Sequence, residues 1–173
     1  MDNFREGLTK IKAFVFDIDG VLSLQTIPLK TTGIPSRTVN LRDGYALQLA
    51  VKKGYKVAII SGSNSKDYLK RLKMLGVKDI YLNSRSKTRH YNHFREKYKL
   101  ENSEILFMGD DIPDYQVMKL AGVPACPSDA DSEIKQVAAY ISDRPGGSGC
   151  VRDVIEQVLR LHNNWMDSHA FAW

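Results

Sequence analysis

The chain has 173 residues, of which 43% are hydrophobic and 26% charged, and its formal net charge is +5. This length is enough for a sizeable hydrophobic core, and we expect a single domain over residues 1–173. The basic residues are spread among acidic ones and form no long block, so we expect no nucleic-acid partner; the modest positive bias suits an anionic small molecule.

The cysteine content and the hydropathy of the chain indicate an intracellular protein. Cys126 and Cys150 are the only cysteines and form no Cys-x-x-Cys pair, so we expect reduced thiols. The first residues lack the apolar stretch of a signal peptide, and no later run is long enough to span a bilayer. We therefore expect a cytoplasmic protein without a membrane partner.

The first predicted strand covers residues 11–16, a short run of apolar and β-favouring residues. Asp17, Asp19 and Gly20 follow it directly. Side chains repeat every second residue in extended chain, so Asp17 and Asp19 point the same way if Asp17 is still extended, and Gly20 permits a sharp turn. Two converging carboxylates predict a bound cation or a shared proton between them. An ordinary Asp-Gly turn remains the alternative on these residues alone.

A segment of different character follows the first strand. Residues 24–41 alternate loosely around a Gly/Pro turn, which predicts a β-hairpin excursion that projects over the site or into a partner subunit. The next predicted helix runs from Tyr45 to Lys53. Asp43 is the expected cap of this helix, and Gly54 ends it.

Strands and helices then alternate regularly. Further strands are predicted at residues 55–60, 79–82, 104–108, 123–126 and 139–141, and helices at 66–75, 86–98, 115–120, 132–137 and 151–161. This alternation predicts an α/β fold with a doubly wound, Rossmann-like parallel sheet. Residues 162–173 contain three large aromatic side chains, and both a frayed terminus and a docked tail are consistent with that composition.

Polar residues gather where several predicted strands end. Besides Asp17 and Asp19, they are Ser61, Gly62, Asp110, Asp111 and Asp114, with Lys87 at the start of a helix on the same side. Ligands bind outside the carboxyl ends of the strands in such sheets, so we expect these side chains to face one crevice. A hydroxyl, a lysine and several carboxylates predict a phosphate site with a Mg²⁺ ion.

These motifs, in this order, resemble those of the haloacid dehalogenase-like phosphohydrolases. The matching segments are 17–21 (Asp-Ile-Asp-Gly-Val), Ser61-Gly62, Lys87 and 109–114. Residues 21–23, 42–45 and 146–149, with Arg152 and Asp153, are similar to a capless branch whose members hydrolyse phosphates of eight- and nine-carbon sugar acids, above all 3-deoxy-D-manno-octulosonate 8-phosphate. The resemblance implies no separate cap domain, Mg²⁺ as the cofactor, and a homotetramer in which the hairpin and a neighbour's tail help build the site.

The resemblance also implies roles for single residues. Asp17 is the expected nucleophile, and Asp19 is expected to protonate the leaving oxygen and then to activate water. An aspartate at position 19 favours phosphatase over dehalogenase or ion-pump chemistry. The remaining implied roles are metal binding by Asp17, the Asp19 carbonyl and Asp110, ordering of the metal's surroundings by Asp111 and Asp114, phosphate binding by Ser61, Gly62 and Lys87, and substrate contacts by Arg42 and Gly147.

Several positions depart from the pattern of that branch. Ser63 stands where octulosonate phosphatases tend to carry Arg and their nine-carbon relatives Glu, and Ser148 stands where Arg is common. Leu24 and Gln25 replace the usual Asp-Gly. A nine-carbon sugar-acid phosphate or another small phosphomonoester therefore stays open as the substrate, and so does a catalytically weak regulatory or assembly module with the same fold. A phosphoacceptor receiver domain does not fit, because its acidic motifs come in another order.

Overall fold

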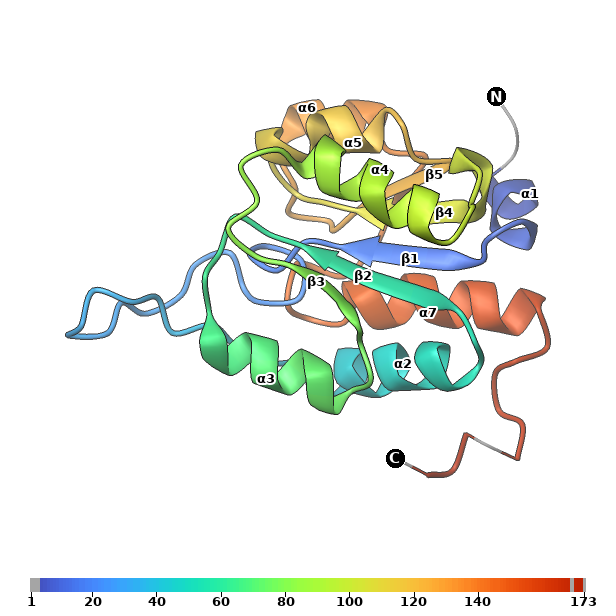
Figure 1. Ribbon diagram of the computed structural model, residues 1–173, viewed down its shortest axis with the longest axis horizontal. Helices are drawn as coiled ribbons and strands as arrows, with labels where there is room; N and C mark the ends of the chain where they lie inside the picture. Colours follow the sequence, from blue (N-terminus) through green and yellow to red (C-terminus); the bar gives the residue numbers. More distant parts are fainter. Residues whose placement is uncertain (1–3, 169, 173) are drawn as a thin grey trace.

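A computed structural model describes residues 4–168 and 170–172 and shows a parallel sheet between two layers of helices (Figure 1). The six strands are β1 (Ala13–Phe16), β2 (Lys56–Ile60), β3 (Asp79–Tyr81), β4 (Ile105–Met108), β5 (Val123–Cys126) and β6 (Tyr140–Ile141). The helices are α1 (Phe4–Thr9), α2 (Leu41–Lys52), α3 (Lys66–Met74), α4 (Lys87–Lys97), α5 (Tyr115–Met118), α6 (Ser132–Val137) and α7 (Cys150–Leu161), with short 3₁₀ turns η1 (Asn102–Glu104) and η2 (Ile112–Asp114). The strand order β3-β2-β1-β4-β5-β6 confirms the predicted doubly wound sheet.

Strand β1 is fully buried and lies in the middle of the sheet. Phe16 at its end pairs with Ile59 of β2 on one side and with Met108 of β4 on the other. These three strands run parallel and end in register. The residues that follow them therefore emerge side by side at one edge of the sheet, where the polar motifs lie.

Side-chain alternation along β1 divides the core between the two faces of the sheet. Phe14 and Phe16 pack in the cluster that includes the buried faces of α2 and α7, whereas Ala13 and Val15 pack in the cluster formed with α4 and α5. In Figure 1, α4, α5 and α6 cover one face, and α2, α3 and α7 cover the other. Both faces of the parallel sheet are thus shielded from water, as its continuous apolar strands require.

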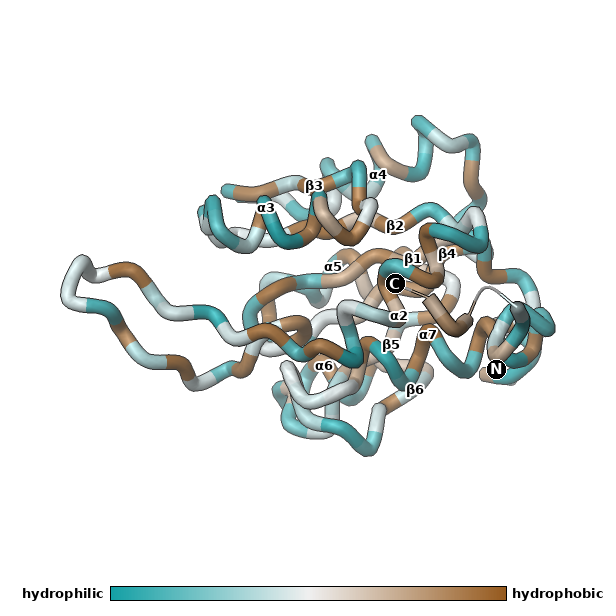
Figure 2. The backbone as a smooth tube through the Cα atoms, turned by 90° about the horizontal axis from the view of Figure 1, so that it is seen from below, coloured by the Kyte–Doolittle hydropathy of each residue, from teal (hydrophilic) through white to brown (hydrophobic). Residues whose placement is uncertain are grey.

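The predicted excursion after β1 is present and projects far from the sheet in both ribbon and tube views (Figures 1 and 2). Leu29 and Pro35 form an antiparallel bridge, and the Lys30 amide donates to the Ile34 carbonyl at 3.0 Å. The hairpin has this isolated bridge but no regular strands. Leu29 and Ile34 are exposed near its tip. Among the described residues, no separate cap domain covers the strand ends.

Helix α2 begins earlier than expected, and Asp43 is not its cap. Asn40 has an extended backbone, and its side-chain oxygen accepts hydrogen bonds from the amides of Arg42 (2.9 Å) and Asp43 (3.2 Å). The first turn of α2 exposes Leu41 and Arg42, so it carries no apolar periodicity that reveals it in the sequence. Asp43 instead accepts a hydrogen bond from the Arg152 amide of α7 at 2.6 Å and so connects two helices. Helix α1 was not predicted either.

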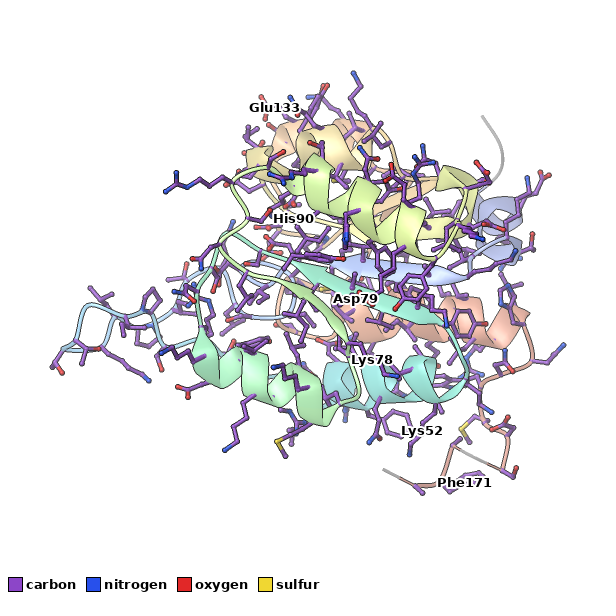
Figure 3. All side chains as sticks on the ribbon, in the orientation of Figure 1. Lys52, Lys78, Asp79, His90, Glu133 and Phe171 are labelled. Carbon is purple, nitrogen blue, oxygen red and sulfur yellow. The ribbon has the colours of Figure 1, made fainter. Side chains whose placement is uncertain are left out.

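The tail after α7 packs on its own chain. The indole of Trp165 meets the Tyr45 ring edge-on at 6.2 Å, and the Arg152 guanidinium lies 4.5 Å from the centre of that indole. Phe171 remains exposed (Figure 3), and Trp173 lies outside the described residues. Both cysteines are buried free thiols, as expected. No described helix combines the length and the apolar character needed to cross a membrane.

Candidate active site

A cavity of about 370 Å³ opens at the carboxyl ends of β1, β2 and β4. It is lined by Asp17, Asp19, Gly20, Gln25, Ser61, Gly62, Ser63, Ser84, Lys87, Asp110, Asp111, Pro113 and Asp114. The structure therefore brings together polar residues that are separated by up to 97 positions in the chain. A larger hollow of about 920 Å³ lies around the opposite ends of the same strands and contains none of these residues.

Three buried aspartates converge in this cavity. Asp17, Asp110 and Asp114 each offer a carboxylate oxygen, and these oxygens lie within 4.8 Å of one another. The Lys87 ammonium lies 2.9 Å from Asp17 Oδ2 and 2.6 Å from Asp114 Oδ1. The other oxygen of Asp17, Oδ1, is buried and has no hydrogen-bond partner among the described residues. An unpartnered buried carboxylate oxygen is costly, so the geometry fits a cation or substrate at this position.

The electrostatics of the cluster follow from its burial. Loss of solvation, reinforced by the neighbouring Asp114 charge, raises the pKa of Asp17 to about 7. Burial and the Asp17 carboxylate raise the pKa of Asp110 to about 8. Burial also acts to lower the pKa of Lys87, but Asp17 and Asp114 outweigh it and the pKa is raised. Lys87 is therefore a fixed positive charge among carboxyl groups that need further neutralisation.

Two glycines make room for the converging carboxylates. A Cβ on Gly20 would lie 1.9 Å from Asp110 Oδ2, and Gly20 has a φ of +79°, which side-chain-bearing residues rarely adopt. A Cβ on Gly109 would lie 2.4 Å from the Cβ of Asp114. The Asp110 amide also donates to Asp114 Oδ2 at 3.2 Å. The loops after β1 and β4 can thus approach closely only because these positions lack side chains.

The loop after β2 supplies hydroxyl groups to the opposite wall. Ser61 is buried, and its Oγ accepts a hydrogen bond from the Ser63 amide at 3.1 Å. The Oγ of Ser63 is buried and has no hydrogen-bond partner among the described residues. With Gly62 between them, these serines present polar atoms toward the cavity that Lys87 enters from the other side.

Asp19 and Asp111 differ from the three clustered aspartates. The Asp19 side chain lines the cavity but is not part of the cluster, and it accepts two hydrogen bonds from Arg37, Nε to Oδ1 at 2.7 Å and a terminal nitrogen to Oδ2 at 2.8 Å. Asp111 is exposed at the rim and accepts from the Ile112 amide at 2.8 Å. Arg37 was not predicted as a site residue, because it lies in the hairpin outside every motif and no local pattern marks it.

The two positions expected to contact substrate lie outside the cavity. Arg42 is exposed and lines a separate hollow of about 770 Å³ together with Arg152. The Gly147 amide donates to the Val21 carbonyl at 2.7 Å, and the Gly147 carbonyl accepts from the Asn40 side chain at 3.3 Å. In this structure the Gly147 backbone braces the loop after β1.

Figure 3 labels two further polar residues, Asp79 and His90, whose side chains are hydrogen-bonded within the fold. Asp79, at the start of β3, accepts hydrogen bonds from Lys97 and Tyr98, both at 2.6 Å. His90 of α4 is hydrogen-bonded to Ser84 Oγ at 2.7 Å. Neither residue lines the cavity of the aspartate cluster.

Comparisons with known proteins agree with this arrangement. A family model described as haloacid dehalogenase-like hydrolase matches residues 39–122. The 3-deoxy-D-manno-octulosonate 8-phosphate phosphatase of Salmonella typhi is 31% identical over 149 residues, which cover 86% of this chain and 79% of the relative. The crystal structure of such a phosphatase from Moraxella catarrhalis, in complex with magnesium, phosphate and a KDO molecule, has a TM-score of 0.89 and 30% identity and covers 95% of this chain and 94% of its own. A Yersinia pestis phosphatase of the same name has a TM-score of 0.90 and 27% identity, covering 94% of this chain and 88% of its own.

The fold and the site define a doubly wound α/β protein with a buried acidic centre at its strand ends. Sequence and structural relatives extend over most of the chain. The chain belongs to the haloacid dehalogenase-like hydrolases, as the order of its motifs predicted, and it is a phosphoric monoester hydrolase.

Proposed function

We propose that the protein is a magnesium-dependent phosphatase that hydrolyses a sugar-acid phosphate, 3-deoxy-D-manno-octulosonate 8-phosphate in the first place, through an aspartyl-phosphate intermediate. The observation that carries this proposal is the meeting of Asp17, Asp110 and Asp114 around Lys87, with one oxygen of Asp17 left unpartnered. The Salmonella and Moraxella relatives, which are named for that reaction, support the choice of substrate.

The residues present fit a Mg²⁺ ion. This ion prefers carboxylate and carbonyl oxygens. The cluster offers carboxylate oxygens of Asp17 and Asp110, and Oδ1 of Asp17 has no hydrogen-bond partner among the described residues. The absence of a side chain at Gly20 leaves space for the Asp110 carboxylate. Asp17, Asp110 and the Asp19 carbonyl would hold the ion, and Asp114 would orient Lys87 from the far side. When bound, the ion would neutralise charge on the carboxylates and on the phosphoryl group.

The chain's own residues would carry the two half-reactions. A carboxylate oxygen of Asp17 attacks phosphorus, the ester P–O bond breaks, and Asp19 gives a proton to the leaving alcohol oxygen. Asp19 then takes a proton from water, which attacks the aspartyl-phosphate and releases inorganic phosphate. Lys87, Ser61 and the Gly62 backbone would bind the phosphoryl oxygens during both steps.

Two tests address this proposal. Replacing Asp17 with Asn should abolish phosphate release in the presence of Mg²⁺, while Asp143→Asn, which removes an exposed carboxylate that does not line the cavity, should leave it intact. Comparing kcat/KM over octulosonate 8-phosphate, nine-carbon sugar-acid phosphates, neutral sugar phosphates and nucleotides would identify the substrate. Full activity of Asp17→Asn would refute the mechanism, and slow turnover of the whole panel despite Mg²⁺ binding would favour a regulatory or assembly module.

We further propose that residues 1–173 act as one domain, that the protein is cytoplasmic, and that it assembles as a homotetramer. Leu29 and Ile34 on the projecting hairpin expose apolar surface that a neighbouring subunit would cover. Light scattering on the purified protein tests the tetramer, and a monomer at all concentrations would contradict it.

A further inference from the structure

The contact between Arg37 and Asp19 joins the hairpin to the proposed catalytic acid. Both guanidinium hydrogen bonds are short, at 2.7 and 2.8 Å, and together they occupy both oxygens of Asp19. The Arg37 side chain is only 11% exposed, whereas that of Asp19 is 44% exposed. While this pair is closed, the guanidinium competes with any other partner for both oxygens of Asp19.

Arg37 is held at this place by its neighbours in the chain. The Ser36 amide donates to the Pro28 carbonyl at 2.8 Å, and the Thr38 amide donates to Ser23 Oγ at 2.9 Å. Ser23 in turn accepts the Gly20 amide through its carbonyl at 3.0 Å. The base of the hairpin is thus attached to the loop after β1, so that Arg37 is presented to the site by a fixed backbone.

A second hollow adjoins the aspartate cavity at this point. It has a volume of about 480 Å³ and is lined by Asp19, Gln25, Thr26, Ile27, Leu29, Pro35 and Arg37. Asp19 and Gln25 line both hollows. A substrate whose phosphate reaches Lys87 and whose other end extends toward the hairpin must therefore pass Asp19. Arg37 is the only basic residue among those that line the second hollow.

We propose that Arg37 recognises an anionic group of the substrate remote from the phosphate, and that this contact releases Asp19 for catalysis. The inference rests on the proposed function and specifies how a sugar-acid phosphate would be selected. A substrate carboxylate can replace the Asp19 carboxylate on the guanidinium, because planar bidentate pairing suits both equally. The exchange of one carboxylate for the other then costs little free energy. A neutral sugar phosphate has no carboxylate to replace that of Asp19, so the Arg37 hydrogen bonds would be lost without compensation.

The experiment compares Arg37→Gln and Arg37→Lys with the wild-type enzyme on two matched substrates. These are 3-deoxy-D-manno-octulosonate 8-phosphate and its C1 carboxamide, which keeps the shape but lacks the charge. Lys78→Gln, at an exposed position that belongs neither to the hairpin nor to either hollow, is the control for the lost positive charge. Thermal unfolding and circular dichroism check that all variants are folded.

We expect the wild-type enzyme to prefer the carboxylate in kcat/KM by roughly 30-fold, as for a charged hydrogen-bonded pair. Arg37→Gln should reduce this preference to about 3-fold or less, through a loss of kcat/KM on the carboxylate substrate, and Arg37→Lys should keep part of the preference. Lys78→Gln should behave as wild type.

Each other outcome overturns a defined part of the account. If Arg37→Gln lowers kcat equally on both substrates, Arg37 only positions Asp19 and the recognition role is wrong. If the wild type prefers the carboxylate and Arg37→Gln keeps the preference, the inference fails while the proposed function stands. If the wild-type enzyme treats both substrates alike, or hydrolyses neither, the sugar-acid specificity itself fails, and the inference fails with it.

Discussion

Gly20 leaves open the space that the carboxylate of Asp110 occupies. The two residues come from loops after different strands, and a Cβ on Gly20 would lie 1.9 Å from Asp110 Oδ2. The close approach of the loops after β1 and β4 therefore depends on the absence of a side chain at Gly20.

Replacing Gly20 with Ala should displace Asp110 and reduce kcat/KM by roughly 100-fold or more, since a small misplacement of catalytic groups has a large effect. Gly54→Ala is the matched control, because Gly54 also has a positive φ, +87°, but its Cβ would meet nothing within 4 Å. In the control variant only backbone strain lowers the free energy of unfolding, by an amount of order 1 kcal/mol. Steady-state kinetics and urea unfolding of both variants separate the two effects. Equal activity losses in both variants would contradict the role given to Gly20.

Lys87 separates the buried carboxylates of Asp17 and Asp114, and its removal leaves them facing each other. We expect Lys87→Met to lower the free energy of unfolding by roughly 3 kcal/mol, because loss of the ammonium group leaves buried carboxylate charge without a partner. Added Mg²⁺ should recover part of this stability. Lys78→Met, at an exposed position (Figure 3), is the control. Urea unfolding with and without Mg²⁺ provides the measurement; a Lys87→Met variant as stable as the control would rule the prediction out.

Binding of Mg²⁺ should release protons near neutral pH. Burial raises the pKa of Asp17 to about 7 and that of Asp110 to about 8 in the metal-free protein, whereas the ion requires both as carboxylates. The apparent affinity for Mg²⁺ should therefore rise as the pH increases from about 6 to about 9. Calorimetric titrations at pH 7, in buffers that differ in ionisation enthalpy, count the protons released. The Asp110→Asn variant should release fewer protons and bind the ion more weakly, and a pH-independent affinity of the wild type would refute this prediction.

Asp43, which accepts the Arg152 amide, should influence the pH dependence of stability. Burial raises its pKa from 3.8 to about 6, so between these values the folded chain keeps a proton that the unfolded chain has released. The contribution to stability is fully present below about pH 4 and is lost as the pH rises through about 6. Relative to Asp43→Asn, the wild type should lose roughly 2 to 3 kcal/mol of unfolding free energy over this range.

The measurement for Asp43 is urea unfolding of the wild type and Asp43→Asn at several values between pH 4 and pH 7. Asp143→Asn, which removes a carboxylate that is 79% exposed, controls for the general effect of lost charge. Parallel pH profiles of the wild type and Asp43→Asn would show that Asp43 does not titrate as its burial implies.

Much of this protein was predictable from local patterns in the sequence. Apolar runs such as residues 11–16, each followed by polar or turn-forming residues, mark the strands of a parallel sheet, since buried strands must be apolar and their ends must turn. Helix α6 was predicted with its observed bounds, Ser132–Val137. Many of the polar residues that line the cavity were predicted as one group, because parallel strands place their carboxyl ends at one edge, whereas Gln25, Ser63 and Ser84 were not predicted.

Only the tertiary structure decided the contacts between distant segments. The pairing of Asp19 with Arg37, the position of Asp114 within the acidic cluster and the link from Asp43 to Arg152 each join residues with no shared periodicity. Such contacts depend on how the hairpin and the helices pack in space, and local propensity carries no information about them. The sequence by itself thus determined the fold class and the chemical character of the site. The folded chain decided which carboxylates face a cation and which one is held by an arginine.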